Sequence, residues 1–354
     1  MNRISFLGLL SLFIVAAHPA LAHHPSSISS TGTSGPIVTI PAATLDKGGL
    51  STWLADVHVS FQELSNAVLE AAALNQEDVH SLASIESPTA GVSYGLTDRI
   101  TLSLQLPYVI RRGIREGEHH HGEESSVEDV NIAVIDRGNS EGIGDLSFLG
   151  LYRFLGQDSG PQAALLIGTK TPTGKTNTRD NEGEVFETEF QPGSGSWDPL
   201  LGVSLTQGSG RWSLDANVLY TLATVGAQHT DLGDRFHYNG AISYRVIGQR
   251  DAIQTAHEHR HEANDHAHQN RSEANGLALD GAIEINGEWQ AKQVISGETD
   301  PNSGGNVIYL SPGLRLSAND WSSFVSLGLP IVNNLNGKQS EPEYRLIGGG
   351  SVSF

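Results

Sequence analysis

Residues 343–354, at the C-terminal end of the chain, read Glu-Tyr-Arg-Leu-Ile-Gly-Gly-Gly-Ser-Val-Ser-Phe and decide the fold. Every second position from Tyr344 to Phe354 is apolar or glycine, while the positions between them, starting at Arg345, are mostly small or polar. Successive side chains of a β-strand point to opposite faces, so the pattern predicts a strand with one apolar and one polar face. Soluble sheets and membrane barrels both contain such strands, and the other segments must decide between them.

The same alternation recurs along the chain. Residues 99–110 carry leucines and Ile100 on one face and small polar residues on the other, and residues 211–222, 236–246 and 277–289 repeat the pattern. We count about twelve such segments, separated by turn residues. Apolar side chains toward lipid and polar side chains toward a wet interior are typical of a transmembrane β-barrel. The sequence therefore predicts an all-β, antiparallel barrel of about twelve strands, whose last strand serves the barrel assembly machinery as its signal.

The lengths of the connections support this prediction, because outer-membrane barrels have short periplasmic turns and long outer loops. Short turns are expected at residues 97–99, 156–161, 207–210 and 318–320, and long loops at residues 112–140, 173–195 and 290–305. The His-rich insertion 248–275 is long but falls on the side of the short turns. Helical spacing of apolar residues within 63–84 predicts a short helix in the first outer loop, either on the surface or as a gate.

The first residues form an export signal. Arg3 is followed by an apolar run over residues 4–17 and by the cleavage site Ala20-Leu21-Ala22. Residues 1–22 are therefore predicted to be a signal peptide. Residues 23–48, rich in Ser, Thr, Gly and Pro, are predicted to be a flexible periplasmic segment, and residues 49–354 the barrel. The expected location is the outer membrane.

Composition excludes several classes of function. The 354-residue chain has 38% apolar residues, no cysteine and a formal net charge of −19. The absence of cysteine excludes disulfides and thiolate metal sites. The acidic balance makes nucleic acid an unexpected partner. A barrel that buries one face of each strand in lipid needs fewer apolar residues than a packed core of this size.

Histidine clusters are the strongest candidates for a binding site. Imidazole and carboxylate groups together suit borderline metals such as zinc, copper and nickel, although a solvated loop without a specific role would have the same composition. No cofactor is expected to be obligatory. The candidate metal ligands are His257, His259, His261, His266, His268, His119, His120, His121, His23 and His24.

A second set of candidates follows from strand alternation. Charges of both signs are expected to point into the lumen, where they either set the selectivity of a pore or pair with one another and close it. The predicted lumen-lining residues are Asp56, His58, Gln105, Asp145, Arg153, Lys170, Asp198, Asp215, Asn217, His237, Arg245, Asp280, Glu284, Arg315 and Arg345.

No motif of an enzyme stands out. Residues 168–176, Gly-Thr-Lys-Thr-Pro-Thr-Gly-Lys-Thr, have five residues between the glycines where a phosphate-binding loop has four, and a proline among them. A Gly-x-Ser-x-Gly elbow for a nucleophile is also missing from the sequence. No catalytic residues are predicted.

Several turn and strand motifs resemble one known family. The chain between residues 50 and 354 is similar to the family called "putative MetA-pathway of phenol degradation", or simply "transporter", among bacterial outer-membrane β-barrels. This resemblance implies the barrel fold and a link to aromatic catabolism. It is carried by Tyr94-Gly-Leu-Thr-Asp-Arg-Ile-Thr-Leu-Ser103, Leu106-Pro-Tyr108, Gly142-Ile-Gly-Asp-Leu146, Lys170-Thr-Pro-Thr-Gly174, Asp300-Pro-Asn-Ser-Gly-Gly305 and Leu310-Ser-Pro-Gly-Leu314.

Three functions remain open from the sequence. The leading prediction is a monomeric channel or transporter for a small solute, linked to divalent metal handling through the His-rich loops. The first alternative is uptake or efflux of small aromatic or apolar compounds. The second alternative is a non-conducting barrel that serves as a metal-binding surface scaffold. Outer-membrane lipid is the expected partner in each case.

Overall fold

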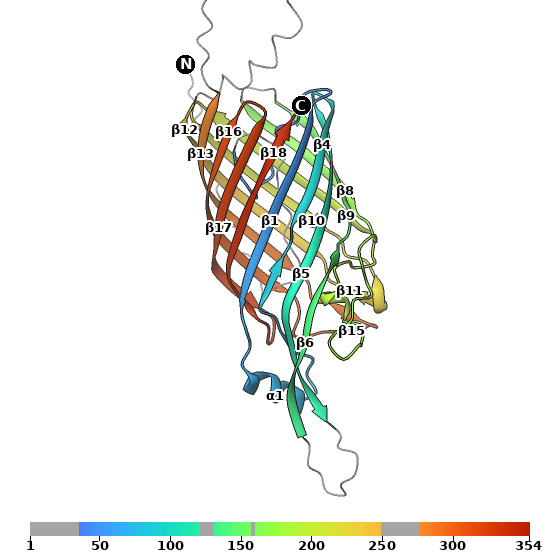
Figure 1. The fold of residues 1–354 in the computed structure, drawn as a ribbon. Coiled ribbons are helices and arrows are strands. Elements are labelled where there is room, and N and C mark those ends of the chain that lie inside the picture. The colour runs from blue at the N-terminus through green and yellow to red at the C-terminus, as the bar shows by residue number, and fades with distance from the viewer. Residues whose placement is uncertain (1–34, 121–130, 157–159, 249–275) are drawn as a thin grey trace, which may run out of the picture.

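The protein is a closed antiparallel β-barrel. The computed structural model describes residues 35–120, 131–156, 160–248 and 276–354. Within them, twelve strands pair each with its neighbours in sequence to form the wall, as the alternation predicts (Figure 1). In chain order these strands are β1 (Leu50–Gln62), β4 (Thr89–Thr97), β5 (Ile100–His120), β7 (Ser147–Leu155), β8 (Pro161–Lys170), β9 (Asp198–Ser209), β10 (Trp212–Thr221), β12 (Arg235–Ile247), β13 (Leu277–Gln290), β16 (Gly305–Ala318), β17 (Trp321–Leu335) and β18 (Glu341–Ser353).

The C-terminal strand closes the barrel. β18 pairs with β17 on one side and with β1 on the other, in a register that sets Ser353 opposite Ser51. The last residue continues this ladder, because the N–H of Phe354 donates to the carbonyl of Leu50 over 2.7 Å. Both edges of the sheet are thereby paired, which leaves no open strand edge in the wall.

The two ends of the barrel differ as expected. The tight turns β4–β5, β7–β8, β9–β10 and β16–β17 lie at the end that holds the C-terminus, drawn at the top of Figure 1. β12 ends and β13 begins at the same end, and residues 249–275 of the His-rich insertion between them lie outside the described residues. The longer loops lie at the opposite end, which we call the outer mouth.

Smaller elements extend the outer mouth. Beyond the level of the barrel, β5 continues as a hairpin with β6. Helix α1 packs against this hairpin as a surface helix, because its buried Leu69 and Ala72 cluster with Val79 and Val134. The remaining elements are α1 (Asn66–Leu74), β2 (His80–Ser81), β3 (Ser84–Glu86), β6 (Asn131–Ile143), the 3-10 helices η1 (Thr188–Phe190) and η2 (Ala227–His229), β11 (Thr230–Asp231), β14 (Val294–Ile295) and β15 (Glu298–Thr299).

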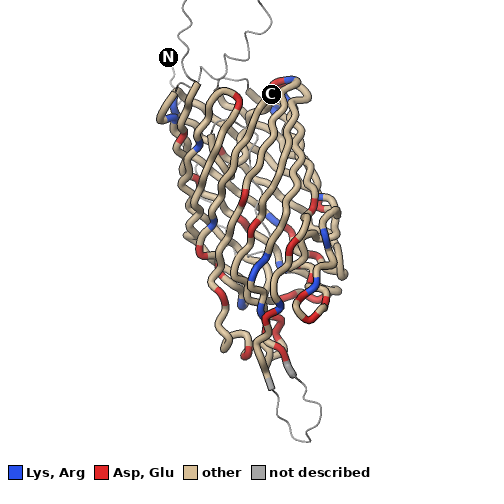
Figure 2. Tube along the Cα trace, viewed as in Figure 1, with Lys and Arg blue, Asp and Glu red and all other residues tan. Residues whose placement is uncertain are grey.

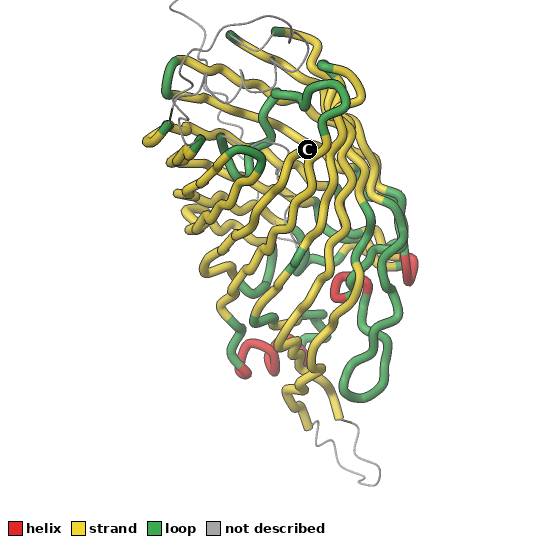
Figure 3. The backbone as a smooth tube through the Cα atoms, turned by 45° about the horizontal axis from the view of Figure 1, so that its top comes forward, coloured by secondary structure: helices red, strands yellow, loops and turns green. Residues whose placement is uncertain are grey.

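The outer surface of the wall is apolar. Leu102, Phe148, Leu214 and Ile283 each leave about half of their side-chain area exposed, although they are large and apolar. A continuous apolar band of this kind is what a barrel presents to the hydrocarbon of a bilayer. The strands run steeply tilted around the barrel (Figures 1 and 3). Among the described residues, no helix has the length and apolar character to cross a membrane.

Residues 36–45, which we call the N-terminal segment, run inside the barrel. Their backbone binds side chains of strands on different sides of the wall, including Asn217 on β10 and Thr101 on β5. A segment outside the barrel could not reach these inward-facing partners together. The expectation of a flexible periplasmic segment is therefore wrong for this part, and the physical reason is that the wall supplies hydrogen-bond partners for its backbone.

Candidate functional site

The N-terminal segment is anchored by one carboxylate. The Oε1 atom of Glu284 on β13 accepts from the N–H of Ile37 at 2.7 Å, and Oε2 accepts from the N–H of Thr39 at 2.8 Å and from its hydroxyl at 2.7 Å. The N–H of Val38 lies 3.2 Å from both oxygens. Arg315 then donates to the carbonyl of Pro36 over 2.8 Å. The glutamate thus holds three successive backbone amides in the middle of the lumen.

A loop enters the lumen from the other end. Residues 171–197, between β8 and β9, form what we call the inward loop. Arg111 donates to the carbonyl of Gln191 over 3.1 Å, and Asp145 accepts from the N–H groups of Gly174 at 2.9 Å and Ser194 at 2.8 Å. These bonds explain why a loop of polar composition is ordered inside the barrel.

The N-terminal segment and the inward loop meet at an apolar cluster. Ile37 from the first and Phe186 and Phe190 from the second are buried together with wall residues such as Trp53 and Phe324. In this structure the N-terminal segment and the inward loop both occupy part of the lumen, and apolar side chains fill the space where they meet.

Most predicted lumen residues do lie on the inner face of the wall, at buried or half-buried positions of the alternation. Arg245 and Asp280 form a buried ion pair with contacts of 2.6 Å and 2.9 Å. Lys170 lies between Asp145 at 2.9 Å and Asp198 at 2.8 Å. The predicted residues found on the inner face are Gln105, Asp145, Arg153, Lys170, Asp198, Asp215, Asn217, His237, Arg245, Asp280, Glu284, Arg315 and Arg345.

Asp56 and His58 are an exception, and their predicted orientation is wrong. On β1 the buried positions are Trp53, Ala55 and Val57, while Asp56 lies at an exposed position and His58 at a half-buried one on the same outer face. The inner face of β1 is apolar because it packs against the apolar cluster of the lumen rather than against water. The usual rule of polar residues inside therefore reverses on this strand.

The strand pairing along β5 changes partner at the level of Pro107. β5 pairs with β7 up to Gln105 and with β6 from Tyr108 onward. Pro107 has no N–H to donate, and its carbonyl accepts from Gly144 over 2.9 Å.

The link between β6 and β7 turns away from β5. The N–H of Leu146 donates to Thr173 Oγ1 over 2.9 Å, and its carbonyl accepts from the N–H of Thr171 over 2.8 Å, both on the inward loop. On the other side of β5, Pro88 begins the link into β4 and also lacks an N–H. We call Pro88, Pro107 and residues 143–146 the seam.

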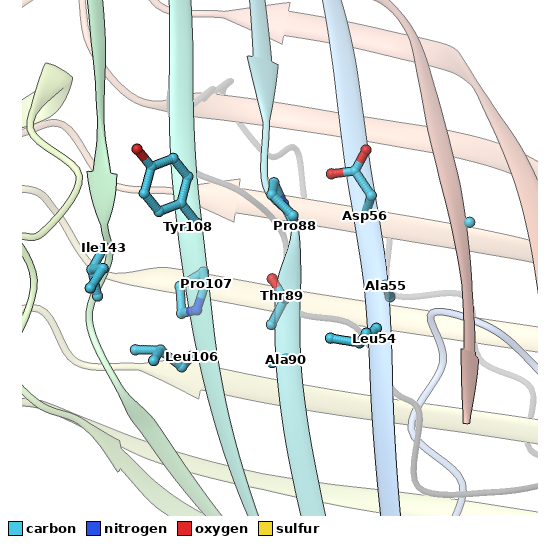
Figure 4. Close-up of a pocket in the computed structure, with 11 residues that line it drawn as sticks. Leu54, Ala55, Asp56, Pro88, Thr89, Ala90, Leu106, Pro107, Tyr108 and Ile143 are labelled. Atoms are coloured by element: carbon cyan, nitrogen blue, oxygen red, sulfur yellow. The ribbon is translucent and has the colours of Figure 1, made fainter. Parts of the chain in front are cut away.

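An apolar groove of about 550 Å³ lies against the seam. Its floor and rims come from β1, β4, β5, β6 and β18, and exposed Leu54, Leu106, Tyr108 and Ile143 line it. In Figure 4, Leu54, Ala90 and Leu106 form one level, and Asp56, Pro88 and Tyr108 form the next. The carboxylate of Asp56 is the one charged group among these lining residues.

A group of titratable side chains gathers at the outer mouth, where acidic residues are dense (Figure 2). His80 Nε2 lies 2.7 Å from Glu116 Oε2, and its Nδ1 lies 3.5 Å from both Asp78 and Glu189. We call His80, Asp78, Glu116, Glu187 and Glu189 the mouth cluster. Ligand atoms of Asp78, His80 and Glu187 all lie within 4.8 Å of one another.

The electrostatics of the mouth cluster follow from its burial and charge. Burial alone would lower the pKa of His80, but the hydrogen bond to Glu116 and the nearby carboxylates outweigh it and raise that pKa well above 6.5. Burial also acts on Glu116, yet His80 and Arg137 dominate and lower its pKa to about 2. Burial and the charges of neighbouring acids raise the pKa of Glu189.

Sequence reasoning missed the mouth cluster. His80 is a single histidine on the short strand β2, and its partners Glu116, Glu187 and Glu189 come from segments far away in the sequence, so no local pattern marks them. The structure does not place the side chains of the predicted histidines. His23, His24, His121 and the histidines of 257–268 lie outside the described residues, and the side chains of His119 and His120 on β5 are likewise not described.

Comparisons with known proteins agree with this architecture. The structure is similar to that of an outer membrane channel from Pseudomonas putida F1, with 15% identity, a TM-score of 0.52, and coverage of 88% of this chain and 98% of that one. A Pseudomonas aeruginosa FadL homologue is 9% identical with a TM-score of 0.39, over 96% of this chain and 99% of that one. The CymD monoaromatic hydrocarbon channel is 10% identical with a TM-score of 0.41, over 88% and 90%.

The likeness of fold rests on the first of these, since the other two scores are lower than 0.5. No curated protein matches the sequence. A family model does match, over residues 114–291, which is half of the chain. That match covers the end of β5 and the strands from β6 through β13, and together with the twelve-stranded barrel it shows that the protein belongs to the family described as "Putative MetA-pathway of phenol degradation".

Proposed function

We propose that the protein is an outer-membrane channel for small aromatic or apolar compounds, which pass between the lumen and the lipid-facing wall through the seam. The observation that carries this proposal is the apolar groove on the outer wall, placed where β5 changes its pairing partner from β7 to β6. A polar solute would gain nothing from such a groove, whereas an aromatic ring would bury its surface there.

The filling of the lumen by two segments of the chain also favours a route through the wall. The N-terminal segment and the inward loop occupy the lumen from its two ends and meet at the apolar cluster. A solute that entered from the outer mouth would meet this cluster near the inner face of β1. The groove lies on the outer face of the same strand, through Leu54 and Asp56. A sideways step through the wall would bypass this cluster.

The family to which the chain belongs carries a description that names phenol degradation, which favours an aromatic solute. Metal transport through the His-rich segments remains a prediction, because those side chains lie outside the described structure. The groove and the seam, in contrast, consist of described residues throughout.

Uptake in whole cells tests the proposed function. A strain that lacks this protein is compared with the same strain expressing it, and the initial uptake of radiolabelled toluene is measured next to that of glycerol, a small polar solute. We expect expression to raise toluene uptake severalfold and to leave glycerol uptake unchanged. Equal toluene uptake with and without the protein, or a rise for glycerol alone, would overturn the proposal.

A further inference from the structure

We propose that the mouth cluster is a binding site for a divalent transition-metal ion of the zinc type, with His80 Nδ1 and carboxylate oxygens of Asp78 and Glu187 as its ligands. This inference is independent of the proposed transport function. It concerns residues that form neither the groove nor the seam, and histidines other than those of the His-rich segments.

The geometry of the three ligands is the first argument. One nitrogen of His80 and one oxygen each of Asp78 and Glu187 lie within 4.8 Å of one another. Ligand atoms bound to one zinc ion at about 2.0–2.2 Å lie roughly 3–4 Å apart, so small side-chain movements bring these three into coordination. Glu189, whose Oε1 lies 3.5 Å from the same nitrogen, is close enough to supply a fourth ligand.

The other side of the imidazole is the second argument. His80 Nε2 faces Glu116 at 2.7 Å, and Glu116 is itself held by Arg137, whose Nε donates to Oε1 over 2.7 Å. Histidines that bind metals usually donate their second ring N–H to a carboxylate, which fixes the ring and directs the free nitrogen at the metal. When a metal ion displaces the proton of Nδ1, the N–H on Nε2 stays with Glu116 and the lone pair of Nδ1 faces Asp78 and Glu189.

An unsatisfied oxygen is the third argument. Oε2 of Glu187 is buried and has no hydrogen-bond partner among the described residues. A buried carboxylate oxygen without a donor costs free energy unless a cation or proton compensates it. Asp300 adds a further acidic side chain to this group. Gln293 Nε2 donates to Glu189 over 2.7 Å and to Asp300 over 2.9 Å, and so links the two carboxylates.

The mixed ligand set decides the class of metal. Calcium and magnesium prefer oxygen ligands alone, whereas an imidazole with carboxylates suits zinc and its neighbours in the first transition row. A bound ion would join the loop that follows α1, through Asp78 and His80, to the inward loop, through Glu187. The ion would thus fix the inward loop in place at the outer mouth.

Calorimetry with zinc chloride tests the site on the full-length protein, purified in detergent without a polyhistidine tag and treated with a chelator. The histidines of the His-rich segments are first replaced by serine, which gives a background free of competing ligands. We expect this background to bind one zinc ion per chain. His80→Asn should weaken binding at least tenfold, and Glu116→Gln, which acts through the orientation of His80, by about 10- to 100-fold.

His58→Asn is the matched control, because His58 also faces one carboxylate, Glu86 at 3.8 Å, but lies outside the mouth cluster. It should bind zinc as the background does. Absence of zinc binding in the background, or equal affinity in the His80→Asn variant, would overturn the proposal. Migration of the folded band on a gel establishes that each variant forms its barrel, and Glu187→Gln replaces His80→Asn if the latter fails to fold. X-ray absorption at the zinc edge should show an imidazole shell in the background protein.

Discussion

At the scale of single residues, Glu284 is the side chain that anchors the N-terminal segment inside the lumen. Its carboxylate accepts from the backbone of Ile37, Val38 and Thr39 and from the hydroxyl of Thr39. Hydrogen bonds to a charged group contribute about 1.5–3 kcal/mol each. A segment of small and apolar residues without secondary structure can therefore stay ordered inside the barrel.

Glu284→Gln should loosen the N-terminal segment. The amide keeps one acceptor oxygen but turns an NH₂ group toward backbone N–H donors, so at least one strong hydrogen bond is lost. Hydrogen–deuterium exchange of peptides covering residues 36–45 should become about 10- to 100-fold faster, which corresponds to the loss of about 1.5–3 kcal/mol. Glu341→Gln, at an exposed position at the start of β18, is the control. Unchanged exchange in Glu284→Gln would show that other contacts hold the segment.

Asp280→Asn should destabilise the barrel much more than the loss of an exposed pair. Asp280 and Arg245 have side chains that are 0% exposed, so the variant leaves a buried arginine without its counter-charge, at a cost of about 3–5 kcal/mol. Glu77→Gln breaks the exposed pair with Lys338 and should cost less than about 1 kcal/mol. Urea unfolding in lipid vesicles, followed by tryptophan fluorescence, measures both. Equal losses would contradict this account of the lumen charges.

The sequence identified the inward charges on most strands but not the mouth cluster. Alternation within one strand is a local pattern, so Asp280 and Arg315 could be assigned to the lumen from their neighbours alone. His80, in contrast, meets Glu116 and Glu189 only because β2, the outer end of β5 and the 3-10 helix η1 come together. That meeting depends on tertiary structure, which no spacing along the chain records.

At the scale of elements, β1 shows where strand patterns mislead. Both of its faces carry apolar residues, and the polar Asp56 and His58 suggested the inner face. The structure places Trp53 and Val57 inside because the N-terminal segment and the inward loop give β1 an apolar neighbour there. Whether the inner face of a strand is polar or apolar depends on what fills the lumen beside it. The sequence had assigned the N-terminal segment to the periplasm and the inward loop to the outer loops, so the apolar neighbour of β1 was not expected.

Gly91 on β4 gives a test of this packing. It lies directly opposite Trp53, and a Cβ atom at Gly91 would come within 2.1 Å of the indole ring. Gly91→Ala should therefore displace the indole and lower the free energy of unfolding by about 1–3 kcal/mol. Gly240→Ala on β12 is the matched control, because a Cβ there meets nothing within 4 Å. Near-ultraviolet circular dichroism and urea unfolding measure the effect, and equal behaviour of the two variants would contradict it.

At the scale of the whole molecule, the sequence predicted the barrel and its number of strands. It did not predict that two segments of the chain fill the lumen. Twelve alternating segments and the short turns determine a closed wall, since each strand pairs with its neighbours in the chain. The filling of the lumen depends on long-range bonds such as Glu284 to Ile37, 247 positions apart. The sequence did not mark the seam either, because Pro107 read only as an ordinary residue of a family motif and Pro88 belonged to no motif.

A disulfide across the seam tests the lateral route most directly. The chain has no cysteine, so Tyr108→Cys with Ile143→Cys introduces one pair at directly opposed positions of β5 and β6. Leu104→Cys with Phe148→Cys is the matched control, since it joins β5 to β7 on the side of the seam nearer the tight turns.

The decisive measurement is the initial uptake of radiolabelled toluene by cells that carry each variant, oxidised and then reduced. We predict that the oxidised seam variant takes up toluene at the rate of cells without the protein, that reduction restores the wild-type rate, and that the control variant transports in both states. Wild-type uptake by the oxidised seam variant, with the disulfide shown to be complete, would contradict passage through the wall.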